Sequence, residues 1–192
     1  MTRLHLVRHG PTHARAMVGW SDIPADLSDI AALSRLSAAL PDRAVVVSSD
    51  LVRASATADA IQGARQRLPH DQALRELHFG DWEMQNARQI GESHPILSRA
   101  YWETPGDIAP PNGESWNQAR ARIDAVIDRL CADHAGGDIV IVAHFGMILT
   151  QVQRARGQTP YQALGQKIDN LSLTQLERTA KGWRVGAINH CP

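Results

Sequence analysis

The chain has 192 residues, with 20 basic and 20 acidic side chains that give a formal net charge of zero at pH 7. This length fits one globular domain with its own core, so we expect a single domain over residues 1–192. The balanced charge and the lack of long runs of lysine and arginine argue against binding to nucleic acid or to a membrane surface. Small molecules or phosphorylated proteins are the expected partners.

The two cysteines, Cys131 and Cys191, match no metal-ligand or redox spacing, so we interpret them as reduced thiols. The apolar stretch at residues 4–7 is too short for the core of a signal peptide. No apolar run approaches the roughly 20 residues that span a bilayer. We therefore expect a soluble, cytoplasmic protein.

Short apolar segments that end in polar residues predict buried strands, and apolar residues at helical spacing predict helices. The predicted strands are 4–7, 44–47, 138–143, 171–176 and 183–187, with a further short element near Leu74. The predicted helices begin near 26–29, near 51 with Ser48-Ser49-Asp50 available as the cap, near 117 and at about His144.

Strands alternating with helices indicate an α/β fold, a three-layer α/β/α sandwich with a mostly parallel central sheet. Residues 86–112 break this alternation, because His94-Pro95, Thr104-Pro105-Gly106 and Pro110-Pro111 interrupt any long element. We interpret this segment as a lid-like insertion.

Polar residues follow three predicted strands, at the carboxyl ends where ligands bind in such sheets. These are Arg8-His9, the segment 48–53 with Arg53, and His144. Phosphoryl transfer needs a nucleophile, cations around the phosphoryl oxygens and an acid for the leaving group. A neutral imidazole such as that of His9 can be the nucleophile, and arginine guanidinium groups bind phosphate through two hydrogen bonds.

Four segments in this order resemble the histidine phosphatase superfamily, the phosphoglycerate mutase-like group, and the likeness covers nearly the whole chain. The segments are Leu6-Val7-Arg8-His9-Gly10, Ser48-Ser49-Asp50-Leu51-Val52-Arg53-Ala54 with Thr57-Ala58, the stretch 74–83, and Val142-Ala143-His144, extended by 112–115 and 170–174. One Arg-His-Gly is a weak signal, but the ordered set is specific.

The resemblance implies that His9 is the phosphorylated nucleophile, Arg8 and Arg53 hold the phosphate, His144 is the second pocket histidine and Glu76 is the proton donor. It implies a histidine acid-type phosphatase that hydrolyses phosphomonoesters and has a phosphoglycerate mutase-like fold. Glu83, in the same loop, is the rival acid. Further candidates for substrate binding are Thr12, Arg15, Trp20, Ser115 and Phe145, with Trp102 as a candidate for specificity.

We expect no metal ion and no other cofactor. His5, His9 and His13 are spaced by four residues, which on a helix could form a metal site, but here they straddle a strand and a Gly-Pro turn. The segment between Glu76 and His144 is compact and the chain ends soon after its last strand. Since the mutase branch of the family typically has a longer insertion and a C-terminal tail, the resemblance implies hydrolysis of the phosphohistidine rather than a mutase reaction. The segment around Trp102, which the protein-phosphohistidine phosphatase branch tends to lack, implies a small-molecule substrate.

Two alternatives stay open, a phosphoglycerate-type mutase and a non-catalytic phosphate-binding domain. Substrate identity also stays open, because the chain differs from the family pattern at Arg15, Met84 and Phe145 and over residues 25–31. Sugar phosphates, nucleotide-derived phosphates and ribazole phosphate all fit. Oligomeric state cannot be predicted from the sequence.

Overall fold

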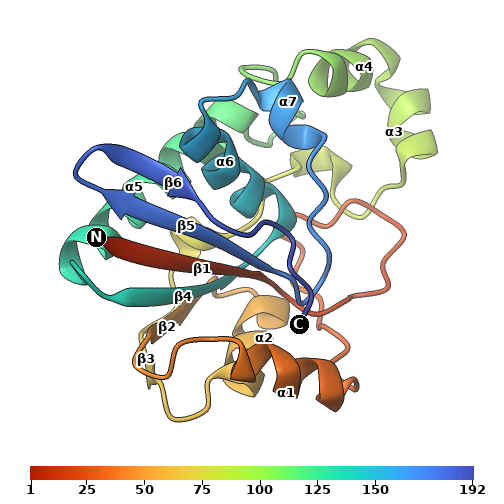
Figure 1. Ribbon diagram of the computed structural model, residues 1–192. Coiled ribbons are helices and arrows are strands. Elements are labelled where there is room, and N and C mark those ends of the chain that lie inside the picture. The colour runs from red at the N-terminus through yellow and green to blue at the C-terminus, as the bar shows by residue number, and fades with distance from the viewer.

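A six-stranded sheet runs through the middle of the molecule, with helices on both of its faces (Figure 1). The structure, a computed structural model, describes all 192 residues. The strand order is β3-β2-β4-β1-β5-β6, and β5 alone runs opposite to the other five strands. The strands are β1 (Thr2–Arg8), β2 (Val45–Ser48), β3 (Gln66–Arg67), β4 (Asp138–Ala143), β5 (Leu173–Thr179) and β6 (Gly182–Val185). The predicted α/β sandwich with a mostly parallel sheet is confirmed.

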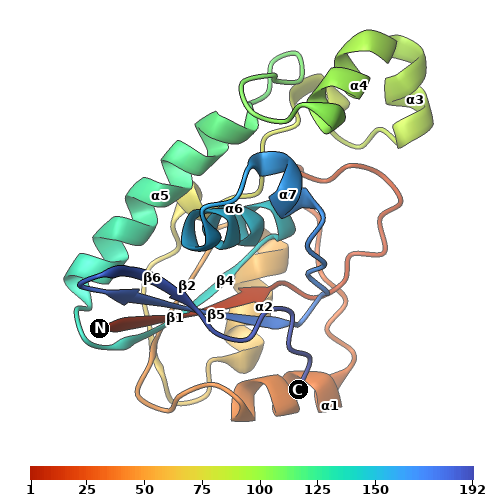
Figure 2. The same cartoon turned by 45° about the horizontal axis from the view of Figure 1, so that its top comes forward.

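Two hydrophobic cores lie on opposite faces of this sheet because side chains alternate along each strand. Leu4 and Leu6 of β1 pack into one core with α5, α6 and α7, whereas Val7 packs into the other with α1 and α2. Figure 2 shows these two helical layers on either side of the strands. The helices are α1 (Ile30–Ala38), α2 (Val52–Ile61), α3 (Ala87–Ser93), α4 (Pro95–Glu103), α5 (Trp116–Asp133), α6 (Phe145–Arg156) and α7 (Pro160–Leu164), with 3₁₀ turns at Gln72–Leu74 and Gly80–Trp82.

The cap predicted for α2 is wrong. Its N-cap is Leu51, with no side-chain hydrogen bond to the helix. The expected cap residues have other partners: the Ser48 hydroxyl bonds His70, and the Asp50 carboxylate accepts two hydrogen bonds from Arg75. The Asp50–Arg75 pair ties the end of β2 to the loop that carries Glu76.

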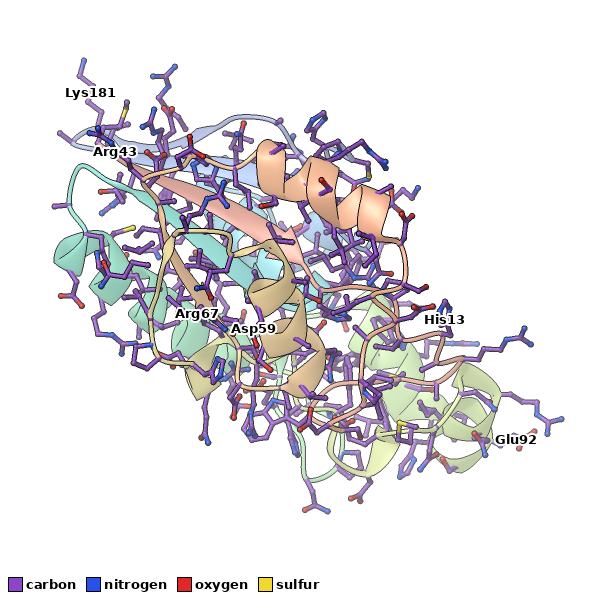
Figure 3. All side chains as sticks on the ribbon, turned by 90° about the horizontal axis from the view of Figure 1, so that it is seen from below. His13, Arg43, Asp59, Arg67, Glu92 and Lys181 are labelled. Carbon is purple, nitrogen blue, oxygen red and sulfur yellow. The ribbon has the colours of Figure 1, made fainter.

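The segment predicted as an insertion forms two short helices, α3 and α4, which lie outside the two helical layers of the sheet (Figures 1 and 2). They have a small core of their own, in which Ile90 and Tyr101 pack against Trp82. Figure 3 shows Glu92 of α3 at the same end of the molecule as His13, and Lys181 and Arg43 at the opposite end. None of the helices is both long and apolar enough to cross a membrane.

Candidate active site

The ends of β1 and β4 bring two histidines together. These strands are parallel neighbours in register, with Arg8 opposite Ala143, so the residues that follow them, His9 and His144, lie side by side. Their ring centroids are 5.1 Å apart. In Figure 1 this edge of the sheet lies to the right, at the end of β1 opposite the N-terminus. His9 and His144, which follow two of the predicted strands, therefore lie together at the carboxyl ends of the strands.

The His9 imidazole is oriented by its own backbone. Its Nδ1 lies 2.7 Å from the Gly10 carbonyl oxygen, so Nδ1 carries the proton and donates it, which leaves the Nε2 lone pair free. Burial, with a smaller contribution from the nearby cations Arg53 and Arg8, lowers the pKa of His9 to about 3, against the opposing effect of the Gly10 carbonyl. His9 is thus neutral, and nucleophilic at Nε2, across the physiological pH range.

His144 is fully buried, and neither of its ring nitrogens has a hydrogen-bond partner within the protein. Burial lowers its pKa well below the usual range, and the neighbouring His9 and Arg53 act in the same direction. Because unpartnered buried polar atoms are rare and costly, these nitrogens are suited to binding a ligand.

Two arginines supply positive charge beside the histidine pair. Arg53, on the first turn of α2, is 1 % exposed and donates hydrogen bonds to the Ser21 and Gly19 carbonyls, at 2.8 and 2.6 Å. Arg8 donates to the Ile168 carbonyl and lies over the Phe145 ring, 5.4 Å from its centroid. Burial lowers the pKa of both guanidinium groups, and the nearby carboxyl group of Glu76 partly offsets this effect.

Glu76 is buried against the start of α6. Its Oε2 accepts a hydrogen bond of 3.0 Å from the Gly146 amide, and its Oε1 accepts one of 3.0 Å from the Leu77 amide. Burial nevertheless raises its pKa, outweighing these hydrogen bonds and the charges of Arg53 and Arg8. A carboxyl group with a raised pKa holds a proton that it can donate, as a general acid requires.

The carboxyl group of Glu83 has a different environment from that of Glu76. Its carboxylate accepts hydrogen bonds from the amides of Gly19, Trp20, Ser21 and Phe79 and from the Ser21 hydroxyl. Burial raises its pKa, but these hydrogen bonds outweigh burial, and the net pKa is lowered. Glu83 is therefore an ionised anchor that holds the 19–21 loop, whose carbonyls in turn bind Arg53.

The other predicted substrate contacts have different surroundings. Phe145 follows His144 directly and packs under Arg8, whereas the side chain of Arg15 is exposed on the loop after β1, near the half-buried Thr12. The Ser115 hydroxyl accepts a hydrogen bond from the Gln118 amide and caps α5.

Trp20 faces the backbone of the Glu76 loop. Its Nε1 donates a hydrogen bond of 2.8 Å to the Glu76 carbonyl oxygen. The guanidinium groups of Arg75 and Arg122 lie 4.9 and 5.8 Å from the centroid of its ring. Arg122 also donates to the Glu76 carbonyl, at 3.2 Å. The contacts of Trp20 therefore support the position of Glu76.

The three histidines spaced by four residues have separate partners. His5 hydrogen-bonds Asp138, and His13 hydrogen-bonds Asp26, while His9 bonds the Gly10 carbonyl. The structure contains no group of three or more histidine, cysteine, aspartate or glutamate side chains that could hold a metal ion.

The profile of the Histidine phosphatase superfamily (branch 1) matches residues 4–190, which is almost the whole chain. The chain belongs to this superfamily. The predicted membership is confirmed.

Two curated members of the histidine phosphatase superfamily are similar in sequence. The glucosyl-3-phosphoglycerate phosphatase of Mycolicibacterium vanbaalenii is 35% identical over 161 residues, covering 76% of this chain and 70% of that protein. The adenosylcobalamin/alpha-ribazole phosphatase of Salmonella typhimurium is 31% identical over 160 residues, covering 79% and 78%. Among solved structures, YhfR of Bacillus stearothermophilus has a TM-score of 0.91 at 26% identity, covering 100% of this chain and 98% of that one.

Other superfamily relatives are much longer. The mycobacterial proteins that match at 31% identity over 157 residues, one of them named a bifunctional protein, are covered over only 41% of their length. The chain therefore corresponds to one part of those relatives.

The sequence motifs contained several supporting residues to which no role was assigned. The Thr57 hydroxyl accepts a hydrogen bond from the Gly10 amide, and the Asn170 amide donates one to the His9 carbonyl. Both residues lie within the matched segments, so membership of a motif was the signal that could have identified them. The role of Gly146 had no such signal, because it depends on how closely Glu76 approaches the backbone.

Proposed function

We propose that this protein is a phosphomonoester hydrolase that acts through a phosphohistidine on His9. The observation that carries this proposal is the histidine pair: a neutral His9 with Nε2 free faces a His144 whose ring nitrogens have no partner. Buried guanidinium groups and a carboxyl group with a raised pKa complete the set that phosphoryl transfer needs.

In the first step, His9 Nε2 forms a bond to phosphorus while the bond from phosphorus to the ester oxygen breaks. Arg8, Arg53 and His144 hold the phosphoryl oxygens, and the Glu76 proton moves to the departing alcohol oxygen. In the second step, water attacks phosphorus and loses a proton to the Glu76 carboxylate, and the bond from phosphorus to Nε2 breaks. Inorganic phosphate leaves and the starting protonation state returns.

The term acid-type fits the electrostatics of this site. A pKa of about 3 keeps His9 neutral in mildly acidic solution, and the raised pKa of Glu76 keeps the acid protonated there. We therefore propose activity that extends to low pH, on a small phosphorylated metabolite, as the names of the two phosphatase relatives support. The free thiols of Cys131 and Cys191 support a cytoplasmic location.

We further propose that residues 86–112 act as the lid of a single-domain enzyme. Tyr101 and Trp102 of α4 line a pocket that is also lined by Glu76 and Phe145, so α4 contributes directly to the wall of the proposed site.

The test is phosphate release from p-nitrophenyl phosphate in the presence of a chelator, comparing wild type with His9→Ala. We expect the variant to lose at least about 1,000-fold in kcat, since the nucleophile is absent. His13→Ala is the matched control, because His13 lies in the same segment with an exposed side chain. Rapid quenching with substrate should trap a phosphohistidine in wild type and in His13→Ala but not in His9→Ala.

Chelator-sensitive turnover, or turnover that persists in His9→Ala, would contradict the proposal. Transfer of phosphate between positions of a substrate without release of inorganic phosphate would indicate the mutase instead. Binding of phosphate with no turnover and no trapped intermediate would indicate a non-catalytic domain.

A further inference from the structure

A small apolar pocket of about 40 Å³ lies beside the carboxyl group of Glu76. Its inner wall contains Leu77 and Trp116, which are almost fully buried in the main core. Its outer wall comes from Tyr101 and Trp102 of α4, and Trp102 is 44 % exposed. The pocket thus has a base in the main core and one wall supplied by α4.

Two of the residues that line the pocket also belong to or adjoin the proposed catalytic centre. Glu76 is the proposed acid, and Phe145 lies between His144 and Gly146 in the chain and beneath Arg8. In the proposed reaction, the ester oxygen receives its proton from Glu76. The carbon group attached to that oxygen therefore lies next to this pocket rather than beside the arginines.

The lining residues include no lysine, arginine or histidine, and Glu76 is the only one with a carboxyl group. A carboxylate or a second phosphate on the leaving alcohol would lose its water here without gaining a cation, which is costly. An apolar group of the same size would gain from burial.

We propose that this pocket selects phosphomonoesters whose leaving alcohol is uncharged and carries a compact apolar group next to the ester oxygen. This inference rests on the proposed function, since it assigns the leaving-group side by the position of the acid. It names alkyl or aryl phosphates as the substrate class, and alcohols that bear a carboxylate as the excluded class.

The test compares kcat/KM for methyl, ethyl, propyl and butyl phosphate and for the carboxylate analogue 4-phosphonooxybutanoate. We expect a gain of about fourfold for each methylene that enters the pocket, levelling off once the pocket is full. The kcat/KM of the carboxylate analogue should be lower than that of butyl phosphate. The factor between them should be at least as large as the factor between butyl and methyl phosphate.

Variants of the pocket wall make the test specific. Trp102→Ala should reduce the ratio of kcat/KM for butyl phosphate to kcat/KM for methyl phosphate several-fold. Ile96 lies on the same helix but is 86 % exposed and does not line the pocket, so Ile96→Ala should leave this ratio unchanged. Leu164→Lys should raise kcat/KM for the carboxylate analogue relative to kcat/KM for butyl phosphate by about fivefold, which corresponds to a partly exposed ion pair.

Equal kcat/KM along the series, or a preference for the carboxylate analogue in wild type, would overturn the inference while leaving the hydrolase intact. An unchanged ratio in Trp102→Ala would also overturn it. Failure of every ester to release phosphate would instead contradict the proposed function on which the inference rests.

Discussion

Glu76 and Glu83 belong to one loop, but their carboxyl groups have opposite environments. Burial dominates at Glu76 and raises its pKa, whereas amides of the 19–21 loop and of Phe79 dominate at Glu83 and lower its pKa. Two side chains of one type can therefore be an acid and an anchor, because the surroundings set the proton affinity. The motif alone could name both candidates but could not separate them, since the deciding hydrogen bonds come from distant parts of the chain.

Glu76→Gln should reduce kcat with an alkyl phosphate by roughly 100-fold or more, the usual contribution of a general acid. The loss should be much smaller with p-nitrophenyl phosphate, because nitrophenolate leaves without prior protonation. In the wild type, kcat/KM should fall as pH rises through the raised pKa of Glu76, since the acid must be protonated. It should fall on the acidic side only near pH 3, where His9 takes up a proton.

The measurement is a pH profile of kcat/KM for both enzymes on both substrates. The variant should lose the alkaline decline with the alkyl ester. Glu83→Gln provides the comparison: it should lower stability through the 19–21 loop without abolishing that decline. If Glu83→Gln removed the alkaline decline and Glu76→Gln kept it, the two roles would have to be exchanged.

At the scale of elements, the long strands and helices were predictable because their apolar spacing encodes the face that each one buries. Apolar residues recur at helical spacing along α5, and all of them are buried: Ile123, Val126, Ile127 and Leu130. The short elements β3 and α7 were not predicted, since two and five residues are too few to show a period. The start of α2 near residue 51 was predicted, but its cap was not, since the expected cap residues Ser48 and Asp50 bond side chains elsewhere.

The first turn of α6 positions the carboxyl group of Glu76, the proposed acid. Gly146 brings its amide to Glu76, and a Cβ placed there would lie 2.5 Å from Glu76 Oε1 and 2.5 Å from Leu77 Cδ1. Gly146→Ala should therefore displace the acid and lower kcat on the order of 100-fold, the effect of about 1 Å of misplacement. Activity on the alkyl and nitrophenyl esters, with circular dichroism as a check on folding, measures this.

Gly91→Ala is the matched control for that substitution. Gly91 lies in α3 with nothing within 4 Å of the position of an added Cβ. Alanine there should stabilise the helix by about 1 kcal/mol and leave kcat as it is. An active Gly146→Ala enzyme would mean that the contact between α6 and Glu76 does not position the acid.

Across the whole molecule, the sheet brings together positive charge that the protein itself does not neutralise. Arg53 is almost fully buried and Arg8 is half-buried, while the raised pKa of Glu76 leaves the nearest carboxyl group protonated over part of the pH range. The sequence placed these residues at one edge through topology alone, because parallel strands end together. It could not reveal the burial of Arg53, whose guanidinium group binds carbonyls of the 19–21 loop that Glu83 anchors.

An excess of buried positive charge makes the stability of the fold depend on an anion. Inorganic phosphate at 100 times its dissociation constant should stabilise the native state by about 2.7 kcal/mol, which for a chain of this size raises Tm by about 5–10 °C. Arg53→Lys should lose most of this rise in Tm, because the lysine ammonium cannot replace the planar guanidinium group that the Gly19 and Ser21 carbonyls hold. Arg184→Lys, with an exposed side chain on β6, should keep the rise in Tm.

Differential scanning calorimetry with phosphate, and with chloride at equal ionic strength, measures each rise in Tm against the Tm of the same variant without phosphate. An equal rise with chloride, or a full rise in Arg53→Lys, would mean that the anion acts away from this cluster and that the strand-end charges are not what phosphate neutralises.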